Sequence, residues 1–186
     1  MSAPAEADPA GATRLRPAVT GEADLVRSIV RETFLDLYRH RHHPVPGPTT
    51  VEFAPLIEAG QVWMIEAATG SGAEPVGIMV LKRHPAYLLM DIVAILPAHQ
   101  HRGHGRAALA FAEAHAATLG LPELRFYTNT TIERNVAFYR RLGYIETGQW
   151  QHPKRPNEIY VDLVKSVRTD GGRPETALDR KPPRAT

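Results

Sequence analysis

The stretch Pro97–Gly120 concentrates residues that could bind an anion. It reads PAHQHRGHGRAALAFAEAHAATLG, and histidines and arginines surround Gly103 and Gly105 where an alanine-rich helix is expected to begin. The N-terminus of a helix exposes N–H groups without partners and carries a partial positive charge. Glycines there let the backbone come close to a ligand, so the stretch predicts a cradle for phosphate. Arg102 and Arg106 add positive charge at its rim.

The spacing within this cradle narrows the class of phosphate ligand. It is not a P-loop, because no Gly-Lys-Ser/Thr follows the glycines, and it lacks the third glycine and the distal acid of a dinucleotide-binding fingerprint. Residues 100–105, QHRGHG, fit instead the pattern Q/R-x-x-G-x-G/A after a strand that ends at Pro97. This pattern resembles the coenzyme A pyrophosphate loop of the GNAT superfamily of N-acetyltransferases.

A second motif lies downstream, in residues 128–144, TNTTIERNVAFYRRLGY. Asn135, Tyr139, Gly143 and Tyr144 resemble the N-x-x-x-Y-x-x-x-G-[FY] signature of the same superfamily. Many members carry the asparagine earlier, at the position where this chain has Ile132. The resemblance covers roughly residues 14–164.

Hydrophobic periodicity and chain breakers predict the elements that position the two motifs. The expected strands are 14–18, 61–67, 75–83, 86–96, 123–128, 144–148 and 158–164, and the expected helices are 21–38, 50–59, 103–119 and 130–142. Residues 86–96 are almost continuously apolar, as in a strand that is buried on both faces. Thr130 and Glu133 have the spacing of a capping box at the start of the last helix.

The order of these elements predicts an α/β (α+β) fold. Its sheet should be mixed, mostly antiparallel and of about six to seven strands, with about four helices on its faces. The resemblance implies the GNAT fold, in which the fourth and fifth strands splay apart into a V. We expect one domain over residues 13–165. The tails, 1–12 and 166–186, carry too few apolar residues to offset their ordering entropy.

The resemblance also implies a cofactor. Acetyl-CoA would lie in the splay, with its pantetheine along the backbone near Val93 and Ile95. Its pyrophosphate would lie on the cradle, which comprises Gln100, His101, Arg102, Gly103, His104, Gly105 and Arg106. Asn135 would hydrogen-bond coenzyme A, and the alternative is that it faces solvent on its helix.

Two residues are candidates for proton transfer. Tyr139 matches the superfamily's general acid, which would give a proton to the leaving thiolate; the alternative is an aromatic side chain on the core face of its helix. Asp91 is the candidate base, because an acid inside a doubly buried strand is costly unless it is used or paired, and burial would raise its pKa. The alternatives for Asp91 are a structural salt bridge or a wetter position at the end of the slot, with water removing the proton.

The sequence marks the residues that would bind the acceptor amine less clearly than those that would bind the cofactor. His40, His42 and His43 lie in a loop, RHRHHPVPGPTT, that walls the acceptor site in the superfamily, although a solvated loop is the alternative. Trp150 lies in the other candidate wall, where it could stack on a substrate or cap the core. The histidine clusters could suggest a metal site, but a loop or helix start would point the rings apart, so no metal is expected.

Composition and sequence patterns argue against several other classes of protein and of mechanism. The chain has no cysteine, which fits a cytoplasmic protein and rules out an acetyl-cysteine intermediate, so transfer would be direct in a ternary complex. No secretory signal pattern and no apolar run of membrane-spanning length occurs. The pI is about 9.0, but the basic residues are scattered, which argues against a nucleic-acid-binding domain.

The sequence therefore predicts an acetyl-CoA-dependent N-acetyltransferase that acts on a primary amine of a small molecule or peptide. A catalytically silent acyl-CoA-binding regulatory module on the same fold is the alternative. A homodimer through the late strands, residues 144–164, is an open possibility from the resemblance.

Overall fold

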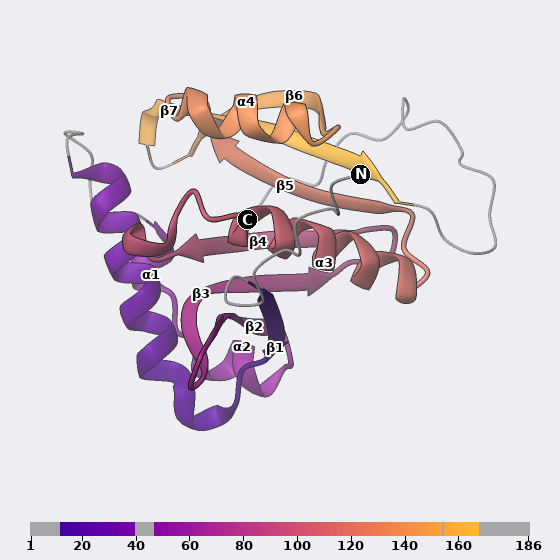
Figure 1. Ribbon diagram of the computed structural model, residues 1–186. Helices are drawn as coiled ribbons and strands as arrows, with labels where there is room; N and C mark the ends of the chain where they lie inside the picture. The colour runs from indigo at the N-terminus through magenta and orange to yellow at the C-terminus, as the bar shows by residue number, and fades with distance from the viewer. Residues whose placement is uncertain (1–11, 40–46, 154, 168–186) are drawn as a thin grey trace, which may run out of the picture.

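The computed structural model describes residues 12–39, 47–153 and 155–167, which form one seven-stranded sheet with helices on both faces (Figure 1). The strands are β1 (Thr13–Pro17), β2 (Val62–Thr69), β3 (Gly72–Arg83), β4 (Leu88–Ile95), β5 (Glu123–Asn129), β6 (Ile145–His152) and β7 (Arg155–Ser166). The helices are α1 (Ala23–Tyr38), α2 (Ala54–Glu58), α3 (His104–Thr118) and α4 (Glu133–Arg141). The expected tails lie almost wholly outside the described residues, and β7 continues one residue beyond the expected domain end at 165.

The predicted fold class is confirmed, with element ends that shift by a few residues. The helix expected over 50–59 begins only at Ala54, because residues 47–50 form a separate 3-10 turn. The expected capping box at α4 is wrong: the N-cap is Ile132, and it has no side-chain cap. Asn129 holds this turn instead, since its Oδ1 accepts hydrogen bonds from the N–H and the hydroxyl of Thr131, at 2.9 and 2.8 Å.

The splay between β4 and β5 follows from the strand order, β1-β2-β3-β4-β5-β7-β6. β4 and β5 are parallel and pair at only two positions, Leu88 with Leu124 and Leu89 with Arg125. Beyond them β4 stays with β3, whereas β5 pairs with β7 along its whole length. Figure 1 shows the two strands close at the right and apart at the left, and the predicted V is therefore present.

A bulge in β4 places Asp91 outside the register with β3. Val80 pairs with Ile92 and Leu81 pairs with Met90, so Asp91 has no partner there. A bulge redirects side chains to the other face of the sheet. Buried and half-buried residues alternate along β4, and both of its faces lie on a core: Met90 packs into one hydrophobic core and Ile92 into the other, as expected for a strand that is covered on both faces.

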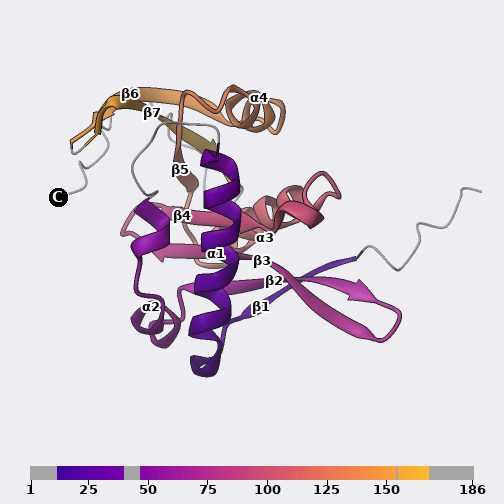
Figure 2. The same cartoon turned by 90° about the vertical axis from the view of Figure 1, so that its left-hand side faces the viewer.

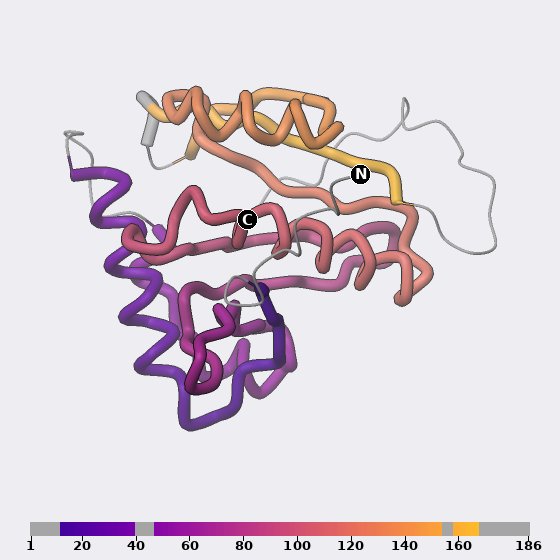
Figure 3. Tube along the Cα trace, viewed as in Figure 1, coloured from indigo at the N-terminus to yellow at the C-terminus, as the bar shows by residue number. Residues whose placement is uncertain are grey.

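The sheet separates two hydrophobic cores. One lies under α3 and α4 and includes Met90, Leu109, Phe126 and Tyr139; the other lies under α1 and α2 and includes Ile92. Figure 2 shows α3 and α4 together on one side of the sheet and α2 on the other. The trace in Figure 3 shows the chain leaving β4, turning at the open side of the splay and returning as α3. The loop of the first motif is thus carried to the mouth of the V.

Gly77 in β3 lies where the sheet leaves no room for a side chain. A Cβ there would clash with the carbonyl oxygen of Ala94 and lie 2.7 Å from Cδ1 of Ile95, both on β4. We expect Gly77→Ala to push β4 away and to lower the free energy of unfolding by about 1–3 kcal/mol, measured by urea unfolding. Gly70→Ala is the matched control, because a Cβ at this turn meets nothing within 4 Å. Equal stability of the two variants would contradict the prediction.

Candidate functional site

The N-terminus of α3 exposes a run of backbone N–H groups at the mouth of the splay. Gly103 is the N-cap and adopts a left-handed φ of 91°, which favours glycine, and no side chain caps the helix. Along α3, the first N–H that donates to a backbone carbonyl is that of Ala107, which donates to the carbonyl oxygen of Gly103 at 3.0 Å. Among the described residues, no N–H of residues 101–106 donates to a backbone carbonyl. This is the geometry that the predicted cradle requires.

Only some of the predicted cradle side chains can reach a ligand there. Gln100 donates from Nε2 to the carbonyl of Ile95 at 3.0 Å, and so ties the loop to the end of β4. His104 is 3% exposed, and its Nδ1 is hydrogen-bonded to the hydroxyl of Thr13 at 2.9 Å. His101, Arg102 and Arg106 are exposed, so these three residues are left as side-chain partners for a phosphate.

The backbone of the cradle has two further features. Gly105 lies in the first turn of α3, and a Cβ there would meet nothing within 4 Å. His101 adopts a φ of 63°, in the left-handed region that non-glycine residues rarely occupy. Such strained residues concentrate at ligand sites, and this one stands beside the exposed N–H groups.

The burial of His104 makes the stability of the fold pH-dependent. Burial lowers the pKa of His104, and the nearby charges of His99 and Arg102 lower it further. The unfolded chain, with a histidine pKa of about 6.5, therefore takes up this proton at a higher pH than the folded protein. Since stability rises with pH wherever the unfolded state binds more protons, the contribution is present above about pH 6.5 and is lost as the pH falls below it.

We expect His104→Asn to weaken the loss of stability between about pH 7 and pH 5. Asparagine keeps a polar atom near Thr13 but does not titrate. The free energy of unfolding, measured by urea at both pH values, checks this, with exposed His101→Asn as the control. If both variants keep the parent's pH dependence, His104 is not its source.

Asp91 lies where the splay opens, and each of its two carboxylate oxygens contacts a side chain of a neighbouring strand. Its Oδ2 forms a salt bridge with Nζ of Lys82 at 2.6 Å, and its Oδ1 accepts a hydrogen bond from the hydroxyl of Tyr127 at 3.1 Å. Its side chain is 18% exposed. The expectation of a deeply buried acid is therefore wrong, and the salt bridge that was the alternative is present. Because Tyr127 belongs to β5, its bond to Asp91 crosses the gap between the diverging strands.

The edge of β4 that faces the splay offers backbone groups to a ligand. Beyond Leu89, β4 forms no ladder with β5 within the described strands. Val93 and Ile95 lie on this stretch; they are half-buried and pack against the core under α3 and α4. A ligand with amide groups could lie along this edge like an added strand.

Tyr139 points from α4 into the core beside the splay. It is 8% exposed, and its ring packs on Phe126 of β5 at a centroid distance of 4.4 Å. Burial raises the pKa of Tyr139 to about 12. No described residue accepts a hydrogen bond from its hydroxyl. Asn135, in the first turn of α4, is half-buried and stays a candidate for a bond to coenzyme A.

The opposite face of β5, β6 and β7 carries an aromatic cluster. Trp150 stacks on Tyr160 at 4.9 Å, and Tyr127 stands edge-on to both rings, at 5.5 and 5.7 Å. Trp150 also donates from Nε1 to Oδ1 of Asp162 at 3.0 Å. Trp150 therefore belongs to neither hydrophobic core, and capping the core is excluded for it. We call Tyr127, Trp150, Tyr160 and Asp162 the aromatic face.

Sequence reasoning missed most of the aromatic face and Lys82. Tyr127 could have been found, because alternation in ELRFYT turns it away from the face that buries Leu124 and Phe126. Lys82 could not, since its contact with Asp91 depends on the bulge. The predicted acceptor residues His40, His42 and His43 lie outside the described residues.

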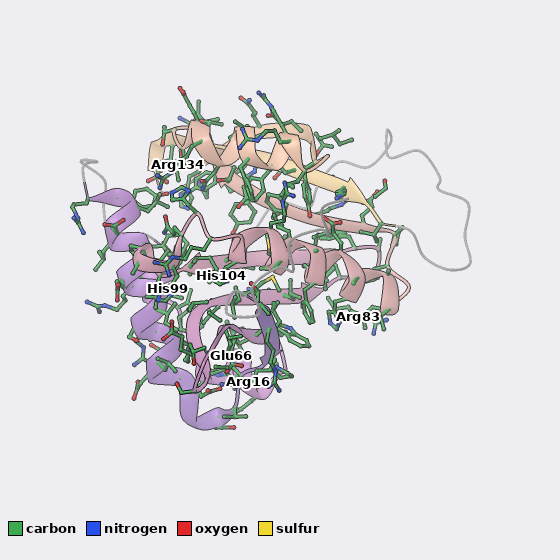
Figure 4. All side chains as sticks on the ribbon, viewed as in Figure 1. Arg16, Glu66, Arg83, His99, His104 and Arg134 are labelled. Carbon is green, nitrogen blue, oxygen red and sulfur yellow. The ribbon has the colours of Figure 1, made fainter. Side chains whose placement is uncertain are left out.

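The two helix starts flank the mouth of the splay. Figure 4 places Arg134, at the start of α4, on the same side of the molecule as His99 and His104 beside the start of α3. The described part of the chain holds no group of three or more His, Cys, Asp or Glu residues that could bind a metal. No described helix is long and apolar enough to span a membrane.

Known structures share this architecture. A GNAT-family acetyltransferase from Listeria monocytogenes has a TM-score of 0.67 at 16% identity, over 83% of this chain and 95% of its own. The PaiA N-acetyltransferase from Thermoplasma acidophilum, solved with coenzyme A, has a TM-score of 0.65 at 15% identity, over 81% and 98%. The ribosomal-protein-S18-alanine N-acetyltransferase from Escherichia coli has a TM-score of 0.62 at 12% identity, over 89% and 100%. At these identities the likeness is one of fold.

Comparison of the sequence, as distinct from the structure, also gives a family match. No curated protein sequence matches the chain significantly. Residues 58–146 match the family model of an acetyltransferase (GNAT) domain, and this range holds both walls of the splay, the cradle and α4. Residues 58–146 therefore match the acetyltransferase (GNAT) domain family, and the fold around them is shared with GNAT-family acetyltransferases.

Proposed function

We propose that the protein transfers the acetyl group of acetyl-CoA directly to a primary amine of a small molecule or peptide. The observation that carries this proposal is the run of N–H groups at residues 101–106 that have no carbonyl partner among the described residues and lie at the mouth of the splay. A pyrophosphate on these groups would direct the rest of the cofactor along the open edge of β4. The Thermoplasma acidophilum protein, which has the same fold, was solved with coenzyme A.

The cofactor, when bound, supplies an activated acetyl thioester, and the side chains around the splay manage charge and protons. As the amine nitrogen forms a bond to the acetyl carbon, the C–S bond breaks and its electron pair stays on sulfur. The Tyr139 hydroxyl, which holds its proton at neutral pH, would donate it to this sulfur. A backbone N–H of β4 would polarise the thioester carbonyl.

Removal of the amine proton is the role that we propose for Asp91. Lys82 and Tyr127 hold its carboxylate in place where the strands part. From there Asp91 could take the proton of an amine that enters over the aromatic face, directly or through one water. Bringing amine and thioester together in one cleft supplies much of the rate.

Two measurements test this function. Calorimetry should show saturable binding of acetyl-CoA, with S-acetylpantetheine, which has no pyrophosphate, binding at least about tenfold more weakly. Release of free thiol in the presence of a panel of primary amines should then show transfer. Binding of acetyl-CoA without transfer to any amine would favour a silent acyl-CoA-binding module. Absence of binding would reject both.

A further inference from the structure

We propose that the acceptor is a cationic amine on an aromatic or apolar body, with no carboxylate beside the amine, and that the aromatic face binds it. This inference rests on the proposed function and specifies its substrate class.

The aromatic face offers ring surface beside the splay. Tyr127 is 39% exposed, although its neighbours on β5, Phe126 and Thr128, are buried. Its hydroxyl is fixed by Asp91, and its ring stands edge-on to the stacked pair of Trp150 and Tyr160. Ring surface exposed in this way can contact an apolar body, and the faces of the rings attract a cation.

Two carboxylates flank these rings, but Lys82 neutralises Asp91 at 2.6 Å, so the charge preference rests on Asp162. Asp91 stands on the splay side of Tyr127, and Asp162 is the cross-strand partner of Tyr127 on β7. Asp162 forms no salt bridge with any described residue. The charge of Arg125 acts on it, but Arg125 is paired with Glu123 and lies over the ring of Tyr87 at 4.4 Å. Burial raises the pKa of Asp162, which shows that its charge is poorly solvated.

A glycine leaves Asp162 accessible from β6. Gly148 lies opposite Asp162 in the register, and a Cβ there would sit 3.6 Å from Oδ2 of Asp162. The other oxygen, Oδ1, accepts the indole N–H of Trp150. One oxygen therefore orients the indole, while the other is not covered by a side chain at position 148. An ammonium group could form an ion pair with this second oxygen, whereas a carboxylate would be repelled by it.

Phenethylamine carries its amine on an aromatic body, and phenylalanine differs from it only by the carboxylate. Comparing these two amines therefore isolates the charge preference that we infer from Asp162.

The experiment compares kcat/KM for phenethylamine, phenylalanine and ethylamine, with acetyl-CoA saturating. We expect phenethylamine to exceed phenylalanine by at least about tenfold, since a carboxylate near an uncompensated acid loses a kcal/mol or more. Trp150→Ala should raise the KM for phenethylamine about tenfold and leave ethylamine unchanged, while Trp150→Phe should retain most of the preference. Asp162→Asn, which can still accept the bond from Trp150, should narrow the difference in kcat/KM between phenethylamine and phenylalanine. Asp24→Asn, at the exposed start of α1, should not change it.

The outcomes separate this inference from the proposed function. Turnover of phenylalanine equal to that of phenethylamine, or an unchanged preference in both Trp150→Ala and Asp162→Asn, overturns the inference while leaving the enzyme an acetyltransferase. If acetyl-CoA binds but none of these three amines is acetylated, the inference fails, and the proposed function fails only if the wider panel of primary amines is not acetylated either. Thermal unfolding of each variant shows whether a lost activity reflects a lost fold.

Discussion

Gly105→Glu is expected to abolish the binding of acetyl-CoA without weakening the fold. A Cβ at this position would meet no protein atom within 4 Å, and the φ of Gly105 is not in the left-handed region. Glutamate in the first turn of α3 also favours the helix, both by propensity and by its charge at the positive end of the dipole. The same charge faces the exposed N–H groups that we assign to the pyrophosphate. We therefore expect a loss of affinity of at least about 100-fold with a free energy of unfolding equal to or above that of the parent.

Three neighbouring variants make this test specific. Gly105→Gln adds the same bulk without charge, so the difference between Glu and Gln measures the repulsion alone. Gly105→Ala should bind acetyl-CoA nearly as the parent does, because the pattern Q/R-x-x-G-x-G/A admits alanine here. Gly103→Ala should instead lose stability, since its φ of 91° strains any side chain. Calorimetry and thermal unfolding measure all four, and undiminished binding by Gly105→Glu would remove the cradle from the cofactor site.

Local patterns were enough to predict the elements and the cradle. Alternation and helical spacing are properties of short segments, and the exposed amides of α3 depend only on Gly103, Gly105 and the helix that follows. The capping of α4 was harder, because Thr130 had the spacing of a cap while its hydroxyl donates to the carbonyl of Ile159 on β7. That competing acceptor comes from a strand that is distant in sequence.

Features that depend on the pairing of strands escaped prediction. The environment of Asp91 depends on a bulge, which exists only once β3 and β4 are in register. Its partners, Lys82 and Tyr127, come from strands on either side of β4. The aromatic face likewise requires β7 to lie between β5 and β6, which brings Tyr127 beside Asp162 and Tyr160 beside Trp150. No local signal in the sequence encodes that strand order.

The role of Tyr139 gives the second large expected effect. Tyr139→Phe keeps the ring that packs on Phe126 and removes a hydroxyl that has no partner among the described residues. We therefore expect unchanged stability and unchanged affinity for acetyl-CoA, because no hydrogen bond within the fold is lost. In contrast, kcat should fall by about 100-fold or more, the scale of a lost general acid. Steady-state kinetics with calorimetry on the same preparation separates the two quantities.

Tyr144→Phe provides the control from the same aromatic cluster. Tyr144 is also buried, but its hydroxyl donates to Glu113 at 2.8 Å, so its removal should lower stability and leave kcat nearly unchanged. The pH dependence adds a second criterion. Since the pKa of Tyr139 is about 12, the acid stays protonated up to strongly alkaline pH, and it should cause no fall in kcat between about pH 7 and pH 10. If Tyr139→Phe keeps the parent's kcat, the phenol is only a core aromatic, and the leaving sulfur must take its proton from water at the mouth of the splay.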